Sequence, residues 1–271
     1  MPARIPLTGG PPLFTVRGSL ALLFASGALL VADLIQRLVI APWVRLRPSA
    51  RDRVLSGWIK IMAWLVTRPV AFLGGCTIPR PERIVPGRSG VLVIMNHQSL
   101  FDIPLVVQTV ADGYPRIVTR ERYTRRWIPV ISQMVRLYQY PVVDPTANRD
   151  DMRVALDDLE AAAATTTMPL AVFPEGTRTR DGEIGRFKRG GLARILAARP
   201  WTVYVYVTDG FWRAAKYKQF VRGLSQVHGR TEHVATLEWT DPTADPNPFL
   251  DHVRELMVER LETMRGGAGV A

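Results

Sequence analysis

The sequence predicts an α/β fold with a largely parallel central sheet flanked by helices, preceded by an N-terminal membrane-associated helical hairpin. Three observations carry this prediction. From Val91 onward, short apolar runs alternate with longer helical patterns, an order typical of parallel sheets. The first ninety residues are long apolar stretches interrupted by arginines. The chain has 271 residues, of which 47% are hydrophobic and 22% charged, so it can bury a full core in one or two domains.

The N-terminal region, residues 1–76, is expected to form membrane-anchoring helices. Residues 18–32 carry no charge, but as a helix they rise about 22 Å, short of a hydrocarbon thickness of about 30 Å. The apolar pattern continues in amphipathic form to Val44, and residues 54–67 repeat it around Lys60. Lysine is costly in mid-bilayer but can reach the headgroups from an interface. These features favour a hairpin lying in one leaflet; a spanning helix, a signal peptide and a soluble pair of core helices are the alternatives.

The net charge of +11 is concentrated at the front of the chain. Residues 1–90 hold twelve basic and three acidic side chains, a balance of +9, whereas residues 91–271 hold 23 and 21, a balance of +2. Because the excess charge is interleaved with apolar segments, it favours a membrane phospholipid surface as partner and argues against nucleic acid. The single cysteine, Cys76, excludes an intrachain disulfide framework and a cysteine metal cluster, and it fits a cytoplasmic environment.

A segment rich in Pro, Gly and Arg, residues 77–90, is expected to link the front end to an α/β domain of residues 91–264. The periodicity of its apolar residues predicts the elements of that domain. In chain order they are a strand at 91–95, a helix at 103–111, a strand at 116–119, a helix at 127–137, a short apolar run at 140–143, a helix at 148–164, a strand at 170–173, a helix at 191–198, a strand at 202–207, β structure at 226–239 and a helix at 246–264. Residues 265–271 are expected to form a flexible tail.

The first candidate site is the turn after the strand at 91–95, where the sequence reads NHQSLFD. His97 lies just past the strand, and Asp102 follows five positions later at the start of a helix. Such a pair cannot meet on a straight helix, but it can meet across a strand-to-helix turn. A carboxylate that accepts from one imidazole nitrogen leaves the other free to take a proton from a hydroxyl, which is general-base chemistry. The spacing alone is weak, since His233 has Glu238 at the same distance; the position at a strand end, where α/β domains place their chemistry, distinguishes the first pair.

The second candidate site is the turn after the strand at 170–173, which reads PEGTRTR. Gly176 permits a tight turn or a close approach of the backbone to a ligand. Glu175 lies among several cations, including Arg178, and must be paired or hydrogen-bonded to something specific. The pattern favours an anionic ligand, phosphate above all, with a solvated basic loop as the alternative. Motifs for a serine nucleophile elbow, a phosphate loop, a dinucleotide site or a zinc helix are missing, so a base without a protein nucleophile indicates direct attack by a substrate hydroxyl.

These two motifs, in this order and each after a buried strand, resemble those of the glycerolipid acyltransferase family, and most closely the bacterial 1-acyl-sn-glycerol-3-phosphate acyltransferases. The resemblance spans about residues 91–208. It implies that His97 is the general base and that Asp102 orients it. The hydroxyl of lysophosphatidic acid would attack a thioester carried on acyl-CoA or acyl carrier protein, with no covalent acyl-enzyme, metal or other cofactor. The residues implied to bind the acceptor phosphate are Glu175, Gly176, Thr177 and Arg178, with Arg120 in a basic-acidic pair ahead of them.

Two regions depart from the family pattern. Where a second motif running from a glycine to an arginine is expected, this chain reads LYQYPVVDP, with Pro145 near the arginine position and Arg149 as the nearest replacement. Tyr204 stands in the apolar strand where a proline is usual. The acceptor is therefore open to another lysolipid, such as a lyso-ornithine lipid or another lysophospholipid. A non-enzymatic protein that binds anionic membranes is the third hypothesis. The expected location is the cytoplasmic face of a bacterial inner membrane.

Overall fold

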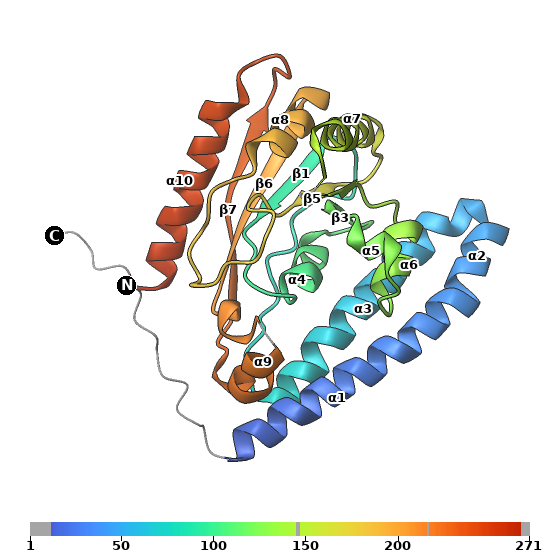
Figure 1. The fold of residues 1–271 in the computed structure, drawn as a ribbon, viewed down its shortest axis with the longest axis vertical. Helices are drawn as coiled ribbons and strands as arrows, with labels where there is room; N and C mark the ends of the chain where they lie inside the picture. The colour runs from blue at the N-terminus through green and yellow to red at the C-terminus, as the bar shows by residue number, and fades with distance from the viewer. Residues whose placement is uncertain (1–11, 145–146, 216, 267–271) are drawn as a thin grey trace.

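The computed structural model describes residues 12–144, 147–215 and 217–266 (Figure 1). Two features singled out from the sequence, Pro145 and residues 267–271 of the expected tail, lie outside this part of the chain. The described residues form an α/β body with a pair of long helices packed along one side of it. The predicted fold class is confirmed.

The front end is a helical hairpin. Helix α1 (Pro12–Ile35) continues through a π-helical turn (Gln36–Ile40) into α2 (Ala41–Leu46), so the three segments form one long helix. A short 3-10 turn reverses the chain, and α3 (Arg51–Gly74) runs back beside α1. Gly75 follows the last residue of α3 and caps the helix; its φ of 68° is a left-handed conformation that glycine adopts without strain. The second helix thus extends beyond residues 54–67 by about one turn at its N-terminal end and about two turns at its C-terminal end.

The long helix turns most of its apolar surface outward. Residues Val16–Leu46 are long and apolar enough to cross a membrane, yet only 22% of their most apolar window is buried. Leu23 and Leu38 are each 72% exposed. A helix in the core of a soluble protein would be mostly buried, so this exposure argues against the soluble pair of core helices and suggests membrane association.

The central sheet has five strands in the order β2-β5-β1-β6-β7, and only the β6–β7 pair is antiparallel. A second sheet pairs β3 with β4 in parallel. The strands are β1 (Val91–Met95), β2 (Arg116–Ile117), β3 (Thr119–Arg120), β4 (Val142–Val143), β5 (Leu170–Val172), β6 (Trp201–Asp209) and β7 (Arg230–Trp239). Since β1 lies between β5 and β6 and is parallel to both, the turns that follow these strands meet at one edge of the sheet.

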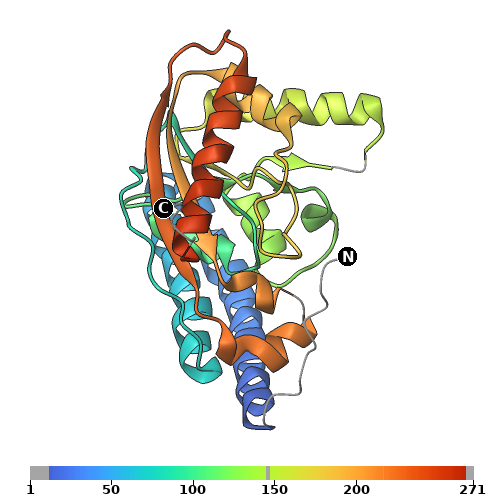
Figure 2. The same ribbon diagram turned by 90° about the vertical axis from the view of Figure 1, so that its left-hand side faces the viewer.

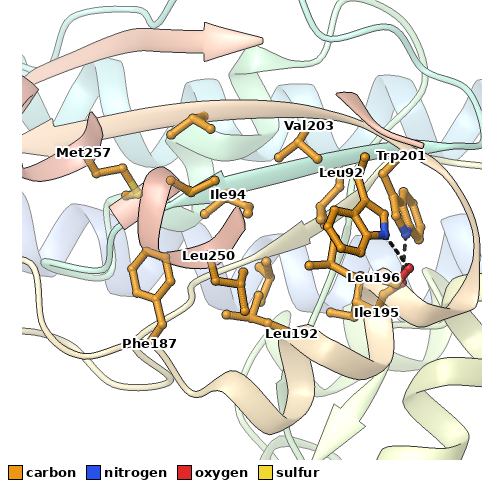
Figure 3. Packing of buried hydrophobic residues seen from close by; sticks show 14 of the residues in the cluster. Leu92, Ile94, Phe187, Leu192, Ile195, Leu196, Trp201, Val203, Leu250 and Met257 are labelled. Atoms are coloured by element: carbon orange, nitrogen blue, oxygen red, sulfur yellow. Dashed lines mark hydrogen bonds between the residues drawn. The ribbon is translucent and has the colours of Figure 1, made fainter. Parts of the chain in front are cut away.

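Successive side chains of β1 point to opposite faces of the sheet, so the core has one layer on each face. Leu92 and Ile94 face one layer, which is covered by α7 (Arg149–Thr165), α8 (Arg189–Ala198) and α10 (Pro246–Met264). In this layer the Trp201 and Trp239 indoles donate to carbonyls at the end of α8 (Figure 3). Figure 2 shows α10 running along the sheet.

The other face of β1 packs on the hairpin. Val91, Val93 and Met95 share a cluster with Leu55 and Ile59 of α3. Also on this face are α4 (Asp102–Thr109) and α6 (Ile131–Leu137), with short helices α5 (Arg122–Arg125) and α9 (Tyr217–Gly223) at the margins. The hairpin is therefore fixed to the body by buried apolar side chains.

Some element boundaries differ from those predicted. The strand expected at 116–119 is divided between the two sheets, and the helix expected at 127–137 begins only at Ile131. Pro129 and Val130 interrupt the helical backbone there, and the φ of Val130 is 66°. The β structure expected from 226 begins at Arg230, after a 3-10 turn (Leu224–Gln226). The sequence reading missed the short helices α5 and α9.

Candidate active site

The first predicted turn connects the ends of β1 and β6. Asn96 is buried, and its amide donates to the carbonyl oxygen of Thr208 at 2.9 Å while its Oδ1 accepts from the N–H of Thr208 at 2.7 Å. A side chain thus extends the strand pairing by one step where the backbone of β1 leaves the sheet. This attachment fixes the point at which the next residue, His97, emerges.

The structure brings His97 and Asp102 together. Nδ1 of His97 lies 2.8 Å from Oδ2 of Asp102, whose side chain is fully buried. The same Oδ2 accepts from the backbone N–H groups of Gln98 at 2.5 Å and Ser99 at 2.7 Å. Because a carboxylate can only accept, the proton of a neutral imidazole is on Nδ1, and the lone pair is on Nε2. Nε2 has no hydrogen-bond partner among the described residues.

The second predicted turn lies against the first. The ring of Phe173 stacks on the His97 imidazole with centroids 4.4 Å apart. The backbone N–H of Thr179 donates to the carbonyl oxygen of His97 at 2.8 Å. Gly176 has a φ of 64°, so the turn needs a residue that tolerates the left-handed region. Two segments about eighty residues apart are thereby held in register around one imidazole.

Glu175 lies beneath His97 rather than in the solvent. It is 4% exposed, and its Oε2 accepts from the backbone N–H of His97 at 3.3 Å. Oε1 is buried without a partner among the described residues. Burial raises the pKa of Glu175 to about 8, although hydrogen bonds from the His97 and Gly185 backbones act in the opposite direction. In this arrangement Glu175 supports the general-base candidate and is neutral at pH 7.

The remaining predicted residues border the same turn. Nη2 of Arg120 donates to the carbonyl oxygen of Gly176 at 2.6 Å, so Arg120 stabilises the turn from the second sheet. Nη1 of Arg178 donates to the carbonyl oxygen of Ala215 at 2.9 Å. Thr177 is exposed at the tip of the turn. The site thus has two arginines: Arg120, which donates to the turn from β3, and Arg178, which belongs to the turn and donates to Ala215.

A large apolar cavity opens beside these residues. Its volume is about 630 Å³, and it is enclosed by α1, α3, α4 and α6. Leu100 and Phe101 of the first turn and Arg178 of the second contribute to its lining. The cavity exists only because the hairpin packs on the body, and no local pattern in the sequence predicts it. Its apolar lining, with a cation among the residues, suits a long hydrocarbon chain with a polar end.

Sequence reasoning also missed a polar network behind the first turn. The Gln98 amide donates to the carbonyl oxygen of Gly182 at 3.1 Å and to Oδ1 of Asp209 at 3.3 Å, and its Oε1 accepts from the backbone N–H of Phe211 at 3.1 Å. Arg265, at the end of α10, donates to both oxygens of Asp209, at 2.9 and 3.1 Å, and to Glu183 at 2.6 Å. Burial would raise the pKa of Asp209, but the hydrogen bonds from Arg265 and Gln98 lower it overall. Asp209 could have been found from the sequence, because it lies at the end of a strand. Nothing in the sequence around Arg265 indicates that it contacts this site.

Residues 77–208 match the family model described as Acyltransferase. A 1-acyl-sn-glycerol-3-phosphate acyltransferase of Cocos nucifera is 25% identical over 228 residues, which cover 83% of this chain and 68% of that protein. One of Borreliella burgdorferi is 23% identical over 217 residues, covering 78% of this chain and 79% of that protein. The crystal structure of the 1-acyl-sn-glycerophosphate (LPA) acyltransferase PlsC from Thermotoga maritima superposes with a TM-score of 0.70 at 19% identity, covering 93% of this chain and 98% of that one. The fold is therefore shared over nearly the whole of both chains.

Proposed function

Residues 77–208 belong to the acyltransferase family, and from this premise we propose that the protein transfers an acyl group from acyl-CoA or acyl carrier protein to the free hydroxyl of 1-acyl-sn-glycerol 3-phosphate, giving phosphatidic acid. The observation that carries the proposal is the contact between His97 and the buried Asp102, at 2.8 Å, at the edge of a large apolar cavity. A general base beside a site for a hydrocarbon chain is what the acylation of a lysolipid requires.

The proposed reaction is a direct transfer. Nε2 of His97 takes the proton of the acceptor hydroxyl as its oxygen forms a bond to the thioester carbonyl carbon. The tetrahedral intermediate then collapses, the carbon–sulfur bond breaks, and the leaving thiolate takes the proton back from the imidazolium. Asp102 holds the Nδ1 proton and stabilises the imidazolium between these steps. The step needs no protein nucleophile and leaves the enzyme unchanged.

The lysolipid would be held at both of its ends. Arg178 is the proposed ligand of the acceptor phosphate, because it lines the apolar cavity and is one residue from Thr179, whose N–H bonds the His97 carbonyl. The hydrocarbon chain would occupy the cavity. Glu175 would position His97 rather than touch the phosphate, and Arg120 would hold the turn that carries Gly176 and Thr177.

The hairpin would place this site at the cytoplasmic face of a bacterial inner membrane. The exposed apolar side chains of the long helix would enter one leaflet, and the arginines at the hairpin turn would contact anionic headgroups. The alternative of a spanning helix makes a different prediction: a tag placed before α1 would be accessible only from the opposite side of the membrane to a tag after α10.

Release of free thiol on mixing an acyl-CoA with lysophosphatidate tests the reaction. His97→Ala is expected to abolish thiol release while membrane association persists, and His252→Ala, which changes an exposed histidine on α10, is the matched control. An active His97→Ala variant would overturn the mechanism. No thiol release by the wild type would instead favour a non-enzymatic membrane-binding protein.

The acceptor itself is tested with a panel of lysolipids. One of the two departures, over residues 137–144, falls in and near β4, which pairs with β3 at Arg120, so it lies close enough to the proposed acceptor site to alter its preference. The other, Tyr204, lies in β6 of the central sheet. Lysophosphatidate is expected to be the best acceptor with a single acyl-CoA. A faster reaction with a lyso-ornithine lipid or another lysophospholipid would replace it as the substrate.

A further inference from the structure

A second cavity lies at the other end of α4. Its volume is about 260 Å³, and it opens between α3, residues 80–83 and the C-terminal end of α4. Its lining shares only Val107 with that of the large cavity, and it includes none of the residues placed in the candidate active site. One water molecule occupies about 30 Å³ in the liquid, so the cavity has room for several water molecules. A phosphate with part of an alcohol headgroup can therefore enter it.

Three cations line this cavity and no carboxylate does. Lys60, Arg80 and Arg83 make no ion pair with any described residue. Asp112 raises the pKa of Lys60, but burial and the charge of Arg83 lower it by more. Glu82, between Arg80 and Arg83 in the sequence, is exposed and does not line the cavity. The Asp112 carboxylate also accepts from the backbone N–H of Gly87 at 3.1 Å. The cavity therefore carries uncompensated positive charge, which attracts an anion.

Part of this charge already has a structural role. Lys60 donates to the carbonyl oxygen of Ala111 at 3.3 Å, and Arg83 donates to that of Val110 at 3.1 Å, so both cap the C-terminal end of α4. Arg80 is different. It is exposed and makes no hydrogen bond or ion pair with any described residue. Capping cannot explain why a third cation lines the cavity.

We propose that this cavity binds the phosphate group of an anionic phospholipid that is not the substrate, with Arg80 and Lys60 as the principal ligands. Lysine and arginine both donate to phosphate oxygens. Helix α3, which carries Lys60, also exposes Ile61 (55%), Trp64 (51%) and Phe72 (81%). These side chains offer apolar surface to the acyl chains of that lipid. The inference rests on the membrane association in the proposed function and is independent of the acyl transfer.

The test measures binding of dihexanoyl phosphatidylglycerol to the full-length protein in detergent micelles by native mass spectrometry. Arg80→Gln is expected to weaken binding about tenfold, the loss of one charge-assisted hydrogen bond. Arg88→Gln is the matched control, because Arg88 is an exposed arginine of the same linker that does not line the cavity. It is expected to leave binding unchanged. Lys60→Met should weaken binding as well, and Arg80→Gln should release as much thiol as the wild type.

Three results would overturn the proposal. Equal binding by the wild type and Arg80→Gln would show that Arg80 is not a ligand of the lipid phosphate and would leave Lys60 and Arg83 with their capping role alone. Equal weakening by Arg80→Gln and Arg88→Gln would show diffuse attraction without a site. If inorganic phosphate binds as tightly as the phospholipid and Arg80→Gln weakens that binding, the ligand of the cavity is a soluble phosphate and not a lipid. A wild type without acyltransferase activity that still binds phosphatidylglycerol through Arg80 would refute the proposed function and leave the cavity assignment intact.

Discussion

Replacing Asp102 by Asn separates the charge of this carboxylate from its hydrogen bonds. A single oxygen, Oδ2, accepts from His97 Nδ1 and from the backbone N–H groups of Gln98 and Ser99, at 2.8, 2.5 and 2.7 Å. The other oxygen lies 3.5 Å from the hydroxyl of Thr208. An Asn carbonyl can take the place of Oδ2 and keep all three bonds, while its NH₂ group faces the Thr208 hydroxyl. The variant should therefore keep both the fold and the histidine tautomer and lose only the negative charge.

That charge matters when the imidazole becomes positive during proton transfer. Two opposite unit charges about 4 Å apart attract by about 4 kcal/mol at an effective dielectric constant of about 20, which corresponds to about a thousandfold in rate. Asp102→Ala should lower activity at least as much and also reduce stability by about 2 kcal/mol or more, since it leaves the two buried backbone donors of Gln98 and Ser99 unpaired at about 1 kcal/mol or more each, besides the partly exposed Nδ1 of His97. The two variants thus share the catalytic defect but differ in stability.

Thiol release from acyl-CoA in the presence of lysophosphatidate measures the rate, and thermal unfolding in detergent measures the stability. The expected result is an Asn variant with a wild-type unfolding midpoint and about a thousandth of the wild-type kcat. An Asn variant that retains more than about a tenth of the activity would refute the role of the charge. An Asn variant as unstable as Asp102→Ala would refute the claim that one oxygen serves all three donors.

Three further variants test other parts of the site. Glu175 has a folded-state pKa of about 8 against an ordinary value of 4.5, so its contribution to stability is complete below 4.5 and is lost as the pH rises toward 8. Glu175→Gln should abolish this slope, about 1.4 kcal/mol per pH unit, in unfolding measured from pH 5 to 9, and an unchanged slope would assign it to another group. Arg178→Ala should raise the KM for a phosphorylated acceptor about tenfold with little effect on kcat, and an equal loss with an acceptor that lacks phosphate would contradict the assigned contact. Ala63→Phe projects a ring into the large cavity; excluding about three methylenes of the lysolipid chain should cost about 2.4 kcal/mol for long-chain acceptors and spare short-chain ones, measured as kcat/KM across acceptor chain lengths, whereas an unchanged profile would place that chain elsewhere.

The elements that could be predicted from sequence are those whose pattern reflects their own burial. The strand at 91–95 and the helix at 246–264 were predicted at their observed bounds, because every residue of the first is buried and the second has a capping Asp245 and a regular apolar face. The strand expected at 116–119 was wrong as a unit, because its two ends pair with different strands. Pairing partners are distant in sequence, so no local pattern distinguishes one apolar strand from two.

The candidate site divides in the same way. Residues in the two turns could be found because each follows a buried strand and strand ends meet at one edge of a parallel sheet. The direction of each side chain could not be found. Glu175 was expected to contact the phosphate, whereas the structure turns it under the His97 backbone, where desolvation keeps it neutral. Neither cavity could be predicted, because both arise where α3 packs on α4.

The packing of the hairpin on the body also decides what the cations of residues 1–90 contact. Several of these cations bind helix ends: Arg17 donates to the carbonyl oxygens of Phe72 and Leu73 at the end of α3, and Arg51 donates to that of Leu137 at the end of α6. Backbone carbonyls at a helix C-terminus carry partial charge, so such contacts orient an arginine without neutralising it. By contrast, Asp33 pairs with Arg37 and neutralises it, which the balance of +9 already includes. Most of the +9 is therefore available to anionic lipid even where the side chains also stabilise the fold, and a cation can cap a helix and bind a phosphate at the same time, as proposed for Lys60.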